Sequence, residues 1–293
     1  MKNYLTIDIG GTDIKYGVIT NKRELIFKGI TPTNTHLGAM SVIEKIKNIF
    51  KELNPKYNFE GISISTTGVI DDETNSLLAP PSIPDWNTIN FRRDLADLNM
   101  KISVENDVNS MALCEQSLIE GSENMKSLFA MTIGTGIGGS IFINGKMHKG
   151  HGFSAGECGK MIVNSNGDTF ESVAATSALV KMAQEVYKNV KDGIDVFNLF
   201  DQGDKKIIDV VNTFYRRLAS GMANLIYILN PDHIIIGGGI TNRGQRFLDE
   251  LNAHIEEVLE PYFLKSYTMS IAQNKNDAGM IGAFINFENT FLK

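Results

Sequence analysis

Two glycine-rich turns, one in each half of the chain, are the segments best suited to hold a phosphate group. The first is Asp8-Ile9-Gly10-Gly11-Thr12, and the second is Gly134-Thr135-Gly136-Ile137-Gly138-Gly139. Glycine allows close approach of the backbone to a ligand and positive φ angles, and the amides of such a turn converge on an anion. Both turns lead into a second strand rather than a helix, so neither is a P-loop. Two such turns predict a duplicated fold that holds one nucleotide between its halves.

Two charged side chains flank the first turn. Asp8 stands at a predicted strand end directly before the glycines, where a carboxylate can hold Mg²⁺ or its waters. The alternative for Asp8 is an aspartate that caps the turn. Lys15 follows the turn and either contacts phosphate or covers the second strand.

A polar triplet, Glu105-Asn106-Asp107, ends the β-rich run 102–104 and precedes a predicted helix. In α/β sheets, ligands lie beyond the carboxyl ends of strands. Asp107 is therefore a candidate for the base that orients a substrate hydroxyl and accepts its proton during phosphoryl transfer. The alternative is an ordinary helix N-cap. The presence of two phosphate turns favours the catalytic interpretation.

Strands and helices alternate along both halves, which favours α/β layers. In the first half we expect strands at 5–9, 16–20, 24–30, 62–65 and 102–105, and helices at 37–53, 91–98 and 108–118. In the second half we expect strands at 128–133, 139–144, 234–236 and 268–271, and helices at 176–188, 205–229, 245–259 and 278–291. We expect one domain over 1–107, completed by the closing helix 278–293, and a second over 108–277. No long linker separates them, which favours a cleft.

Composition favours a cytoplasmic enzyme. The 293 residues carry a formal charge of −6 with scattered lysines, which disfavours a nucleic-acid surface. The two cysteines, Cys114 and Cys158, imply no disulfide framework and fit a reducing compartment. The chain starts directly with a predicted core strand, so we expect no signal peptide. No apolar run reaches the roughly 18 residues of a membrane span, so no membrane partner is expected.

These features together resemble the ROK family of sugar kinases (repressors, open reading frames and kinases), within the actin-like ATPase and hexokinase superfamily. The resemblance covers essentially the whole chain, and the order of its markers is more specific than any single marker. They are Asp8–Thr12 with Lys15, Ser65-Thr66-Thr67-Gly68, Glu105-Asn106-Asp107, Gly134–Gly139, Ala155-Gly156-Glu157 and Gly237-Gly238-Gly239. The resemblance implies a ribonuclease H-like fold with two similar α/β domains around a central cleft. It also implies transfer of the γ-phosphoryl group from ATP, with Mg²⁺, to the 6-hydroxyl of a hexose.

The same resemblance implies roles for individual residues. It places the base at Asp107 and a sugar contact at Asn106. Glu157 matches a ligand of the sugar hydroxyls, and Glu171 falls where a second sugar glutamate is expected; the alternative for both is a solvated loop carboxylate. Gly68 and Asn87 are further candidates for the sugar site. The implied nucleotide residues are Asp8, Gly10, Gly11, Thr12, Lys15, Gly134, Thr135, Gly136, Gly238 and Gly239.

One loop departs from the family pattern. ROK kinases usually carry Glu-x-Gly-His followed by a Cys-x-Cys-Gly-x-x-Gly-Cys cluster that binds structural zinc. This chain has Glu157-Cys158-Gly159-Lys160, and residues 164–170 contain no cysteine. Tetrahedral zinc requires four good ligands. Cys158 with the distant His148 and His151 is not a convincing set, so we predict no structural zinc.

The sequence leaves the substrate open among glucose, a β-glucoside and N-acetylmannosamine. A sugar-responsive ROK-type regulator is the alternative function, but a helix-turn-helix would have to precede the first strand, which begins at about Leu5. A non-catalytic sugar sensor is a further alternative, disfavoured by the retention of Asp8 and Asp107. The resemblance also implies a homodimer formed through the second half. The broad apolar arc of 207–229 fits that dimer or, equally, a central core helix of a monomer.

Overall fold

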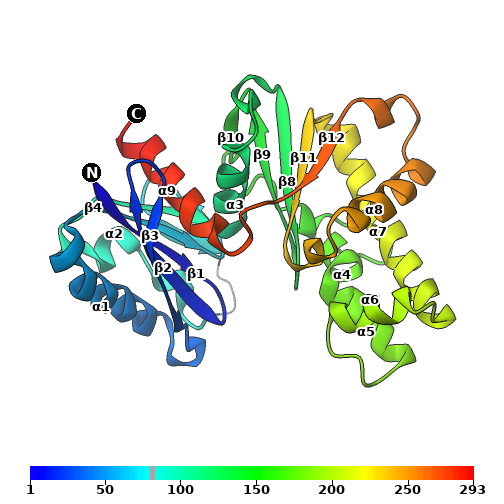
Figure 1. Cartoon of the computed structure of the whole chain (residues 1–293), viewed down its shortest axis with the longest axis horizontal. Coiled ribbons are helices and arrows are strands. Elements are labelled where there is room, and N and C mark those ends of the chain that lie inside the picture. The colour runs from blue at the N-terminus through cyan, green and yellow to red at the C-terminus, as the bar shows by residue number, and fades with distance from the viewer. Residues whose placement is uncertain (80–82) are drawn as a thin grey trace. The chain divides into compact units, whose positions relative to one another are not determined.

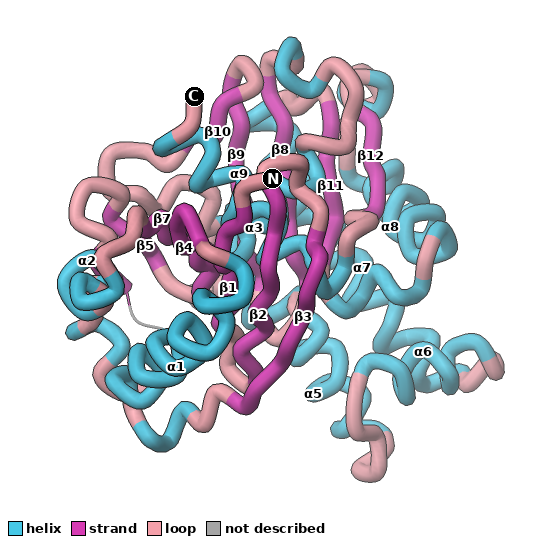
Figure 2. Tube along the Cα trace, turned by 60° about the vertical axis from the view of Figure 1, so that its left-hand side comes forward, coloured by secondary structure: helices cyan, strands magenta, loops and turns pink. Residues whose placement is uncertain are grey.

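Among the described residues, two five-stranded sheets share one strand order, and one further pair of strands forms a separate hairpin. Figures 1 and 2 show the two larger sheets. The computed structural model describes residues 1–79 and 83–293. The first sheet has the strand order β3-β2-β1-β4-β7, and the second has the order β10-β9-β8-β11-β12. In each sheet the first two pairs are antiparallel and the last two are parallel. The repeated order confirms the predicted α/β class with two similar halves.

The first sheet has an apolar face covered by a long helix. Its strands are β1 (Asn3–Ile9), β2 (Asp13–Thr20), β3 (Leu25–Pro32), β4 (Phe59–Thr66) and β7 (Ile102–Asn106). Alternate residues of a strand point to opposite faces of the sheet. In β1, Leu5, Ile7 and Ile9 belong to one buried cluster with the apolar stripe of α1 (Ala39–Tyr57). The side chains of Leu5, Ile7 and Ile9 are therefore part of the core.

The opposite face of this sheet carries more polar side chains and is covered by the last helix of the chain, α9 (Ala278–Phe291). The ring of Tyr4 lies 4.8 Å from that of Phe284, and the Thr6 hydroxyl donates a hydrogen bond of 2.6 Å to the carbonyl of Met280. The other named elements of this part are α2 (Phe91–Asp94), α3 (Asp107–Gln116) and the hairpin strands β5 (Val69–Asp71) and β6 (Ser76–Ala79).

The second sheet packs against a group of helices. Its strands are β8 (Ser127–Ile133), β9 (Ile137–Ile143), β10 (Lys146–His148), β11 (His233–Gly237) and β12 (Thr268–Ile271). The helices of this part are α4 (Phe170–Ala174), α5 (Thr176–Val186), α6 (Gly193–Asp201), α7 (Lys205–Leu229) and α8 (Gln245–Val258). Side chains from β8, β11 and all five helices form one large buried cluster.

The long helix α7 lies at the centre of this cluster. It contacts α4, α5, α6 and α8, and residues such as Phe214, Leu218 and Met222 are buried among them. Contact with α4 is close, because a Cβ on Gly221 would lie 2.1 Å from the ring of Phe170. Core packing within the single chain therefore accounts for the broad apolar arc seen in the sequence. Dimerisation stays a prediction.

The contacts divide the chain into two compact units. The first unit is 1–120 with 150–154 and 276–293, and the second unit is 121–149 with 155–275. The predicted domain boundary between residues 107 and 108 stays a prediction about independent folding. Among the described residues, no helix is long and apolar enough to cross a membrane.

The expected helices 205–229 and 278–291 and the expected strand 268–271 have the predicted bounds. Five short elements were not expected: β5, β6, β10, α4 and α6. Two of these, α4 and α6, carry residues of the candidate site.

Candidate functional site

The carboxyl ends of three parallel strands meet at one edge of the first sheet. In the register of β1, β4 and β7, Asp8 is level with Ser65, and Ile9 is level with Thr66 and Asn106. Asp107 follows β7 directly as the first residue of α3. Neighbouring strands lie about 4.8 Å apart, so Asp8 and Asp107 belong to one small region of the first unit.

Asp8 is held on the face of β1 that α9 covers. The Ser65 hydroxyl donates a hydrogen bond of 2.8 Å to Oδ1 of Asp8. Burial raises the pKa of Asp8, while the bond from Ser65 and the charge of Lys15 act in the opposite direction. On α9, a Cβ added to Gly279 would lie 2.5 Å from the carboxyl carbon of Asp8. Gly279 therefore gives Asp8 its space, a role that sequence analysis missed because the two residues are far apart in the chain.

The first glycine turn is held in shape by its own backbone and by Thr33. The Gly10 amide donates to the carbonyl of Asp13 at 3.0 Å, and the Thr33 hydroxyl donates to the carbonyl of Gly10 at 2.7 Å. A Cβ on Gly11 would meet no atom within 4 Å, so this side of the turn is open. Among the described residues, Gly10, Gly11, Gly134 and Gly136 do not have positive φ angles. These glycines therefore do not adopt the positive φ angles that we expected.

Lys15 lies opposite Asp8 in the antiparallel pair of β1 and β2. Its Nζ atom is 3.4 Å from Oδ1 of Asn276, which precedes α9. The side chain is thus directed toward the face of the sheet that carries Asp8 and α9. This position agrees with either of the two roles considered for Lys15.

Asn106 and Asp107 make different hydrogen bonds at the start of α3. Asn106 is the N-cap, and its Oδ1 accepts hydrogen bonds from the amides of Val108 and Asn109 at 2.8 and 3.1 Å. Its side-chain amide donates to the carbonyl of Gly68 at 3.0 Å. Gly68, with φ of 103°, is thereby joined to the end of β7. Capping falls mainly on Asn106, although Oδ1 of Asp107 also accepts a bond of 3.0 Å from Val108.

Asn87 is exposed on the 3-10 helix 86–88. The adjacent Trp86 is fully buried and packs edge-on against Phe91, with ring centroids 5.8 Å apart. Trp86 is therefore a core residue, and the sugar contact assigned to Asn87 stays a prediction.

In the second unit, the second glycine turn is joined to the start of α5. The Gly134 amide donates to the carbonyl of Gly136 at 3.0 Å, and the Thr176 amide donates to the carbonyl of Gly134 at 2.9 Å. The Ser177 hydroxyl donates to the carbonyl of Thr135 at 2.6 Å. A helix N-terminus carries a partial positive charge. The turn and the first residues of α5 thus form a continuous backbone surface suited to phosphate.

The two candidate sugar glutamates lie near the same turn. Glu171, on α4, forms an ion pair of 2.5 Å with Nζ of Lys160, and its Oε2 would lie 2.8 Å from a Cβ on Gly136. Desolvation raises the pKa of Glu157; the charge of Lys160 lowers it, and that of Glu171 raises it. The structure therefore brings Glu171, Lys160 and the second glycine turn together, with Glu157 in electrostatic contact. Sequence analysis did not foresee the ion pair.

The loop that departs from the family pattern, which carries Glu157–Lys160, is closely packed. Cys158 is buried, and burial raises the pKa of its thiol to about 12, so the thiol is protonated at neutral pH. Gly159 packs so closely on β9 that a Cβ would lie 2.1 Å from the carbonyl oxygen of Ile137. Within 1–79 and 83–293, no group of three or more His, Cys, Asp and Glu side chains could hold a metal ion. The zinc content stays a prediction.

A pocket of about 520 Å³ lies in the second unit beside the segment Gly237-Gly238-Gly239. Gly238 follows β11 with φ of 89°, and a Cβ there would lie 2.3 Å from the carbonyl oxygen of Ile133. The pocket is bordered by the following 3-10 helix, η6 (Gly239–Arg243), and by α6. Its lining residues are Thr176, Asp192, Gly193, Ile194, Phe197, Asn198, Asp201, Gly239, Ile240, Asn242 and Arg243. Asp192 caps α6 by accepting from the amide of Asp195, a local signal that could have revealed this helix.

Comparisons with known proteins give a consistent result. The model of the ROK family matches residues 4–289. A beta-glucoside kinase of Listeria innocua is 31% identical over 96% of this chain and 95% of its own length. A glucokinase of Thermotoga maritima is 28% identical over 94% of each chain.

Among solved structures, a Listeria monocytogenes protein described as a candidate N-acetylmannosamine kinase has a TM-score of 0.88 and 28% identity, covering 98% of this chain and 99% of its own. The ROK glucokinase of Streptomyces griseus, solved in complex with glucose and AMPPNP, has a TM-score of 0.81 and 23% identity, covering 96% and 97%. The second likeness shows the fold alone.

Proposed function

The chain belongs to the ROK family of sugar kinases, and we propose that it transfers the γ-phosphoryl group of ATP to the 6-hydroxyl of a hexose or hexose derivative. The observation that carries this proposal is the edge of the first sheet. There, Asp8 lies near the carboxyl end of β1, the Gly10–Thr12 turn follows β1, and Asp107 follows β7; both strands are parallel to β4. This arrangement supports a role for Asp8 near the phosphates of ATP and a role for Asp107 at the 6-hydroxyl of the sugar.

Asp107 acts as the general base in this proposal. Its carboxylate orients the 6-hydroxyl and accepts the proton as the hydroxyl oxygen attacks the γ-phosphorus. The position at the first turn of α3 fixes its backbone, and the cap at Asn106 holds that turn in place. Asn106 keeps one contact to Gly68, which would allow both residues to border the sugar.

Asp8 fits the role of a residue near Mg²⁺. Mg²⁺ takes one or two protein carboxylates and completes its shell with water and substrate phosphates, so the absence of a carboxylate cluster among the described residues agrees with this donor set. When bound with ATP, the ion neutralises charge on the phosphates. Ser65 fixes the orientation of the Asp8 carboxylate, and Gly279 leaves room for it.

The pocket between α6 and η6 is the proposed site of the adenosine group. It is partly apolar, with Ile194, Phe197 and Ile240 in its lining, as expected for a base and ribose. Beside it, Gly238 turns the backbone with a φ of 89°, and a Cβ on Gly239 would meet no atom within 4 Å. The turn Gly134–Gly136, with the N-terminus of α5, would then receive phosphate, because Thr176 belongs both to the pocket lining and to that turn's hydrogen bonds.

The sugar is proposed to contact Asn106, Asp107, Glu157 and Glu171, with Gly68 and Asn87 as further candidates. The proposed substrate is glucose, a β-glucoside or N-acetylmannosamine. A glucokinase and a beta-glucoside kinase among the relatives support the first two, and a structural neighbour described as a candidate N-acetylmannosamine kinase supports the third.

A sugar panel tests the proposal. The purified chain is incubated with Mg²⁺ and ATP and with glucose, cellobiose, N-acetylmannosamine or N-acetylglucosamine, and ADP release is measured. We expect at least one sugar to give release well above the rate of ATP hydrolysis without sugar. Release that no sugar increases would contradict the proposal.

A further inference from the structure

The pocket between α6 and η6 has one residue that joins its two sides. Gly239, Ile240 and Asn242 line it from η6, while Ile194 and Phe197 are among the residues that line it from α6. The last residue of η6, Arg243, also lines the pocket, and its side chain is only 8% exposed.

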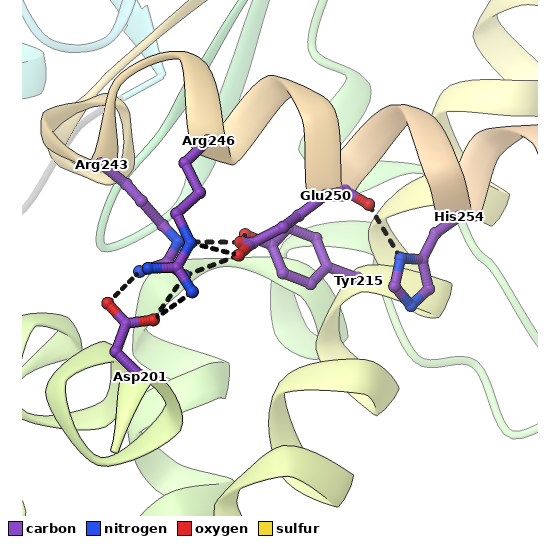
Figure 3. Close-up of polar contacts among 6 residues, drawn as sticks. All are labelled: Asp201, Tyr215, Arg243, Arg246, Glu250 and His254. Atoms are coloured by element: carbon purple, nitrogen blue, oxygen red, sulfur yellow. Dashed lines mark hydrogen bonds and ion pairs between the residues drawn. The ribbon is translucent and has the colours of Figure 1, made fainter. Parts of the chain in front are cut away.

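The guanidinium of Arg243 forms two double ion pairs (Figure 3). On α6, Oδ1 and Oδ2 of Asp201 accept from Nη2 and Nη1 at 2.8 and 3.1 Å. On α8, Oε1 and Oε2 of Glu250 accept from Nη2 and Nε at 2.6 and 2.8 Å. The Tyr215 hydroxyl of α7 donates to Oε2 of Glu250 at 2.7 Å. Arg243 therefore links η6 to α6 directly, to α8 directly and to α7 through one carboxylate.

Two aromatic rings of α6 lie against the same guanidinium. Its central carbon is 4.5 Å from the centroid of Phe197 and 5.5 Å from that of Phe200. Cation–π contacts of a desolvated arginine are stabilising. Phe197 also lines the pocket, so Arg243 is in direct contact with one of the pocket walls.

Four of the five N–H groups of Arg243 are already used. Nε, Nη1 and Nη2 all donate to carboxylates, in the planar double geometry that arginine provides and lysine does not. Because two carboxylates offset its charge, this guanidinium is poorly suited to bind phosphate. Its effect on a ligand must therefore act through the residues that it positions.

We propose that Arg243 is a positioning residue for the nucleotide, which sets the distance between α6 and η6 and so the width of the base pocket. The inference rests on the proposed function, because it takes the pocket as the adenosine site. Rigid placement of pocket walls raises affinity by removing the need to order them during binding.

The test uses the full chain and compares three substitutions. Arg243→Met removes both ion pairs, and Arg243→Lys keeps the charge but cannot bridge two carboxylates in this geometry. Arg246→Met is the matched control: Arg246 contacts the same Asp201 and Glu250 at 2.8 and 3.1 Å, but it is 55% exposed and does not line the pocket. The dissociation constant for Mg²⁺–ATP is measured by calorimetry, together with KM for ATP, KM for the sugar and Tm.

We expect Arg243→Met to weaken ATP binding by about tenfold or more, in line with the cost of misplacing a binding group. Arg243→Lys should show a smaller loss, Arg246→Met less than about twofold, and KM for the sugar should stay within about twofold in all three. If Arg243→Met does not fold, Arg243→Lys and Asp201→Asn supply the comparison; Asp201→Asn weakens the α6 end of the link together with the contact of the control residue Arg246.

Unchanged ATP affinity in the folded Arg243 variants would overturn the inference, as would an equal loss in Arg246→Met or an equal rise in KM for the sugar. Failure of the unsubstituted chain to bind ATP would instead contradict the proposed function. The two failures are therefore distinguishable.

Discussion

Two carboxylates at the same sheet edge have different surroundings, and this difference supports different roles. Asp8 accepts a hydrogen bond from Ser65, and burial raises its pKa, so a cation beside it would favour its ionised form. Asp107 stands at the first turn of a helix, where a negative charge is stabilised by the helix dipole.

Replacing Asp107 by Asn should lower turnover by roughly 10²-fold or more, because the sugar hydroxyl would lose its base. Sugar binding should change little, since asparagine keeps a similar shape. Turnover is measured by ADP release and sugar binding by calorimetry. Near-normal turnover in Asp107→Asn would refute the assignment of the base.

Lys160 should control the pH dependence of the sugar site. Its positive charge lowers the pKa of Glu157, which desolvation and the charge of Glu171 raise. In Lys160→Met, Glu157 would bind its proton at higher pH, and the acidic limb of kcat/KM for the sugar should move to higher pH.

The control for this measurement is Lys181→Met, an exposed lysine on α5. Lys160→Arg should keep the limb close to its original position, because the positive charge remains. An acidic limb that is the same in Lys160→Met as in the unsubstituted chain would show that Lys160 does not influence a group needed for sugar turnover.

Strand ends and glycine turns carry the residues of the candidate site, and small residues allow neighbouring elements to pack closely there. Gly238 is the clearest case because it combines a positive φ with close contact to β8.

The substitution Gly238→Ala should therefore lower the free energy of unfolding by about 2 kcal/mol or more, through left-handed backbone strain and overlap with Ile133. Gly239→Ala is the matched control, since a Cβ there meets no atom within 4 Å, and its stability should stay within about 0.5 kcal/mol. Urea unfolding followed by circular dichroism measures both. Equal stability of the two variants would mean that the tight backbone contact is not required.

Sequence patterns predicted the long elements because their hydrophobic periods are clear. The even and odd residues of β1 separate two faces, and α7 carries an apolar arc over its whole length. The short helices α4 and α6 were missed, because five and nine residues are too few to show a clear helical repeat of apolar side chains.

The positions of candidate residues at strand ends were predictable where one segment carries them, as for Asp8 with its turn or Asn106-Asp107. Contacts between residues that are distant in the chain were not predictable. Arg243 and Asp201 are 42 residues apart, and Gly279 meets Asp8 only after α9 has packed on the first sheet.

For the whole molecule, the altered loop predicts independence from zinc. Lys160 pairs with Glu171, and Cys158 is a buried thiol, so packing and one ion pair hold this region. Elemental analysis should find less than stoichiometric zinc, and EDTA should leave Tm unchanged while it stops turnover by removing Mg²⁺. One zinc ion per chain that EDTA removes with a fall in Tm would contradict this prediction.

We also propose that the chain forms a homodimer. This proposal rests on the family resemblance alone, because the apolar side chains of α7 are buried within one chain. Two-fold dimers are the commonest oligomers. Light scattering at micromolar concentration should give twice the 32.3 kDa of one chain. A monomer mass with full kinase activity would refute the proposal.

The central claim is that this protein phosphorylates the 6-hydroxyl of a sugar from ATP. Its most direct test is phosphorus and carbon NMR of the product formed from the best sugar of the panel, with ADP measured in the same sample. The account predicts a 6-phosphate ester equal in amount to ADP, and almost none with Asp107→Asn over the same time. A phosphate on another oxygen, or ADP with inorganic phosphate and no sugar ester, would contradict it.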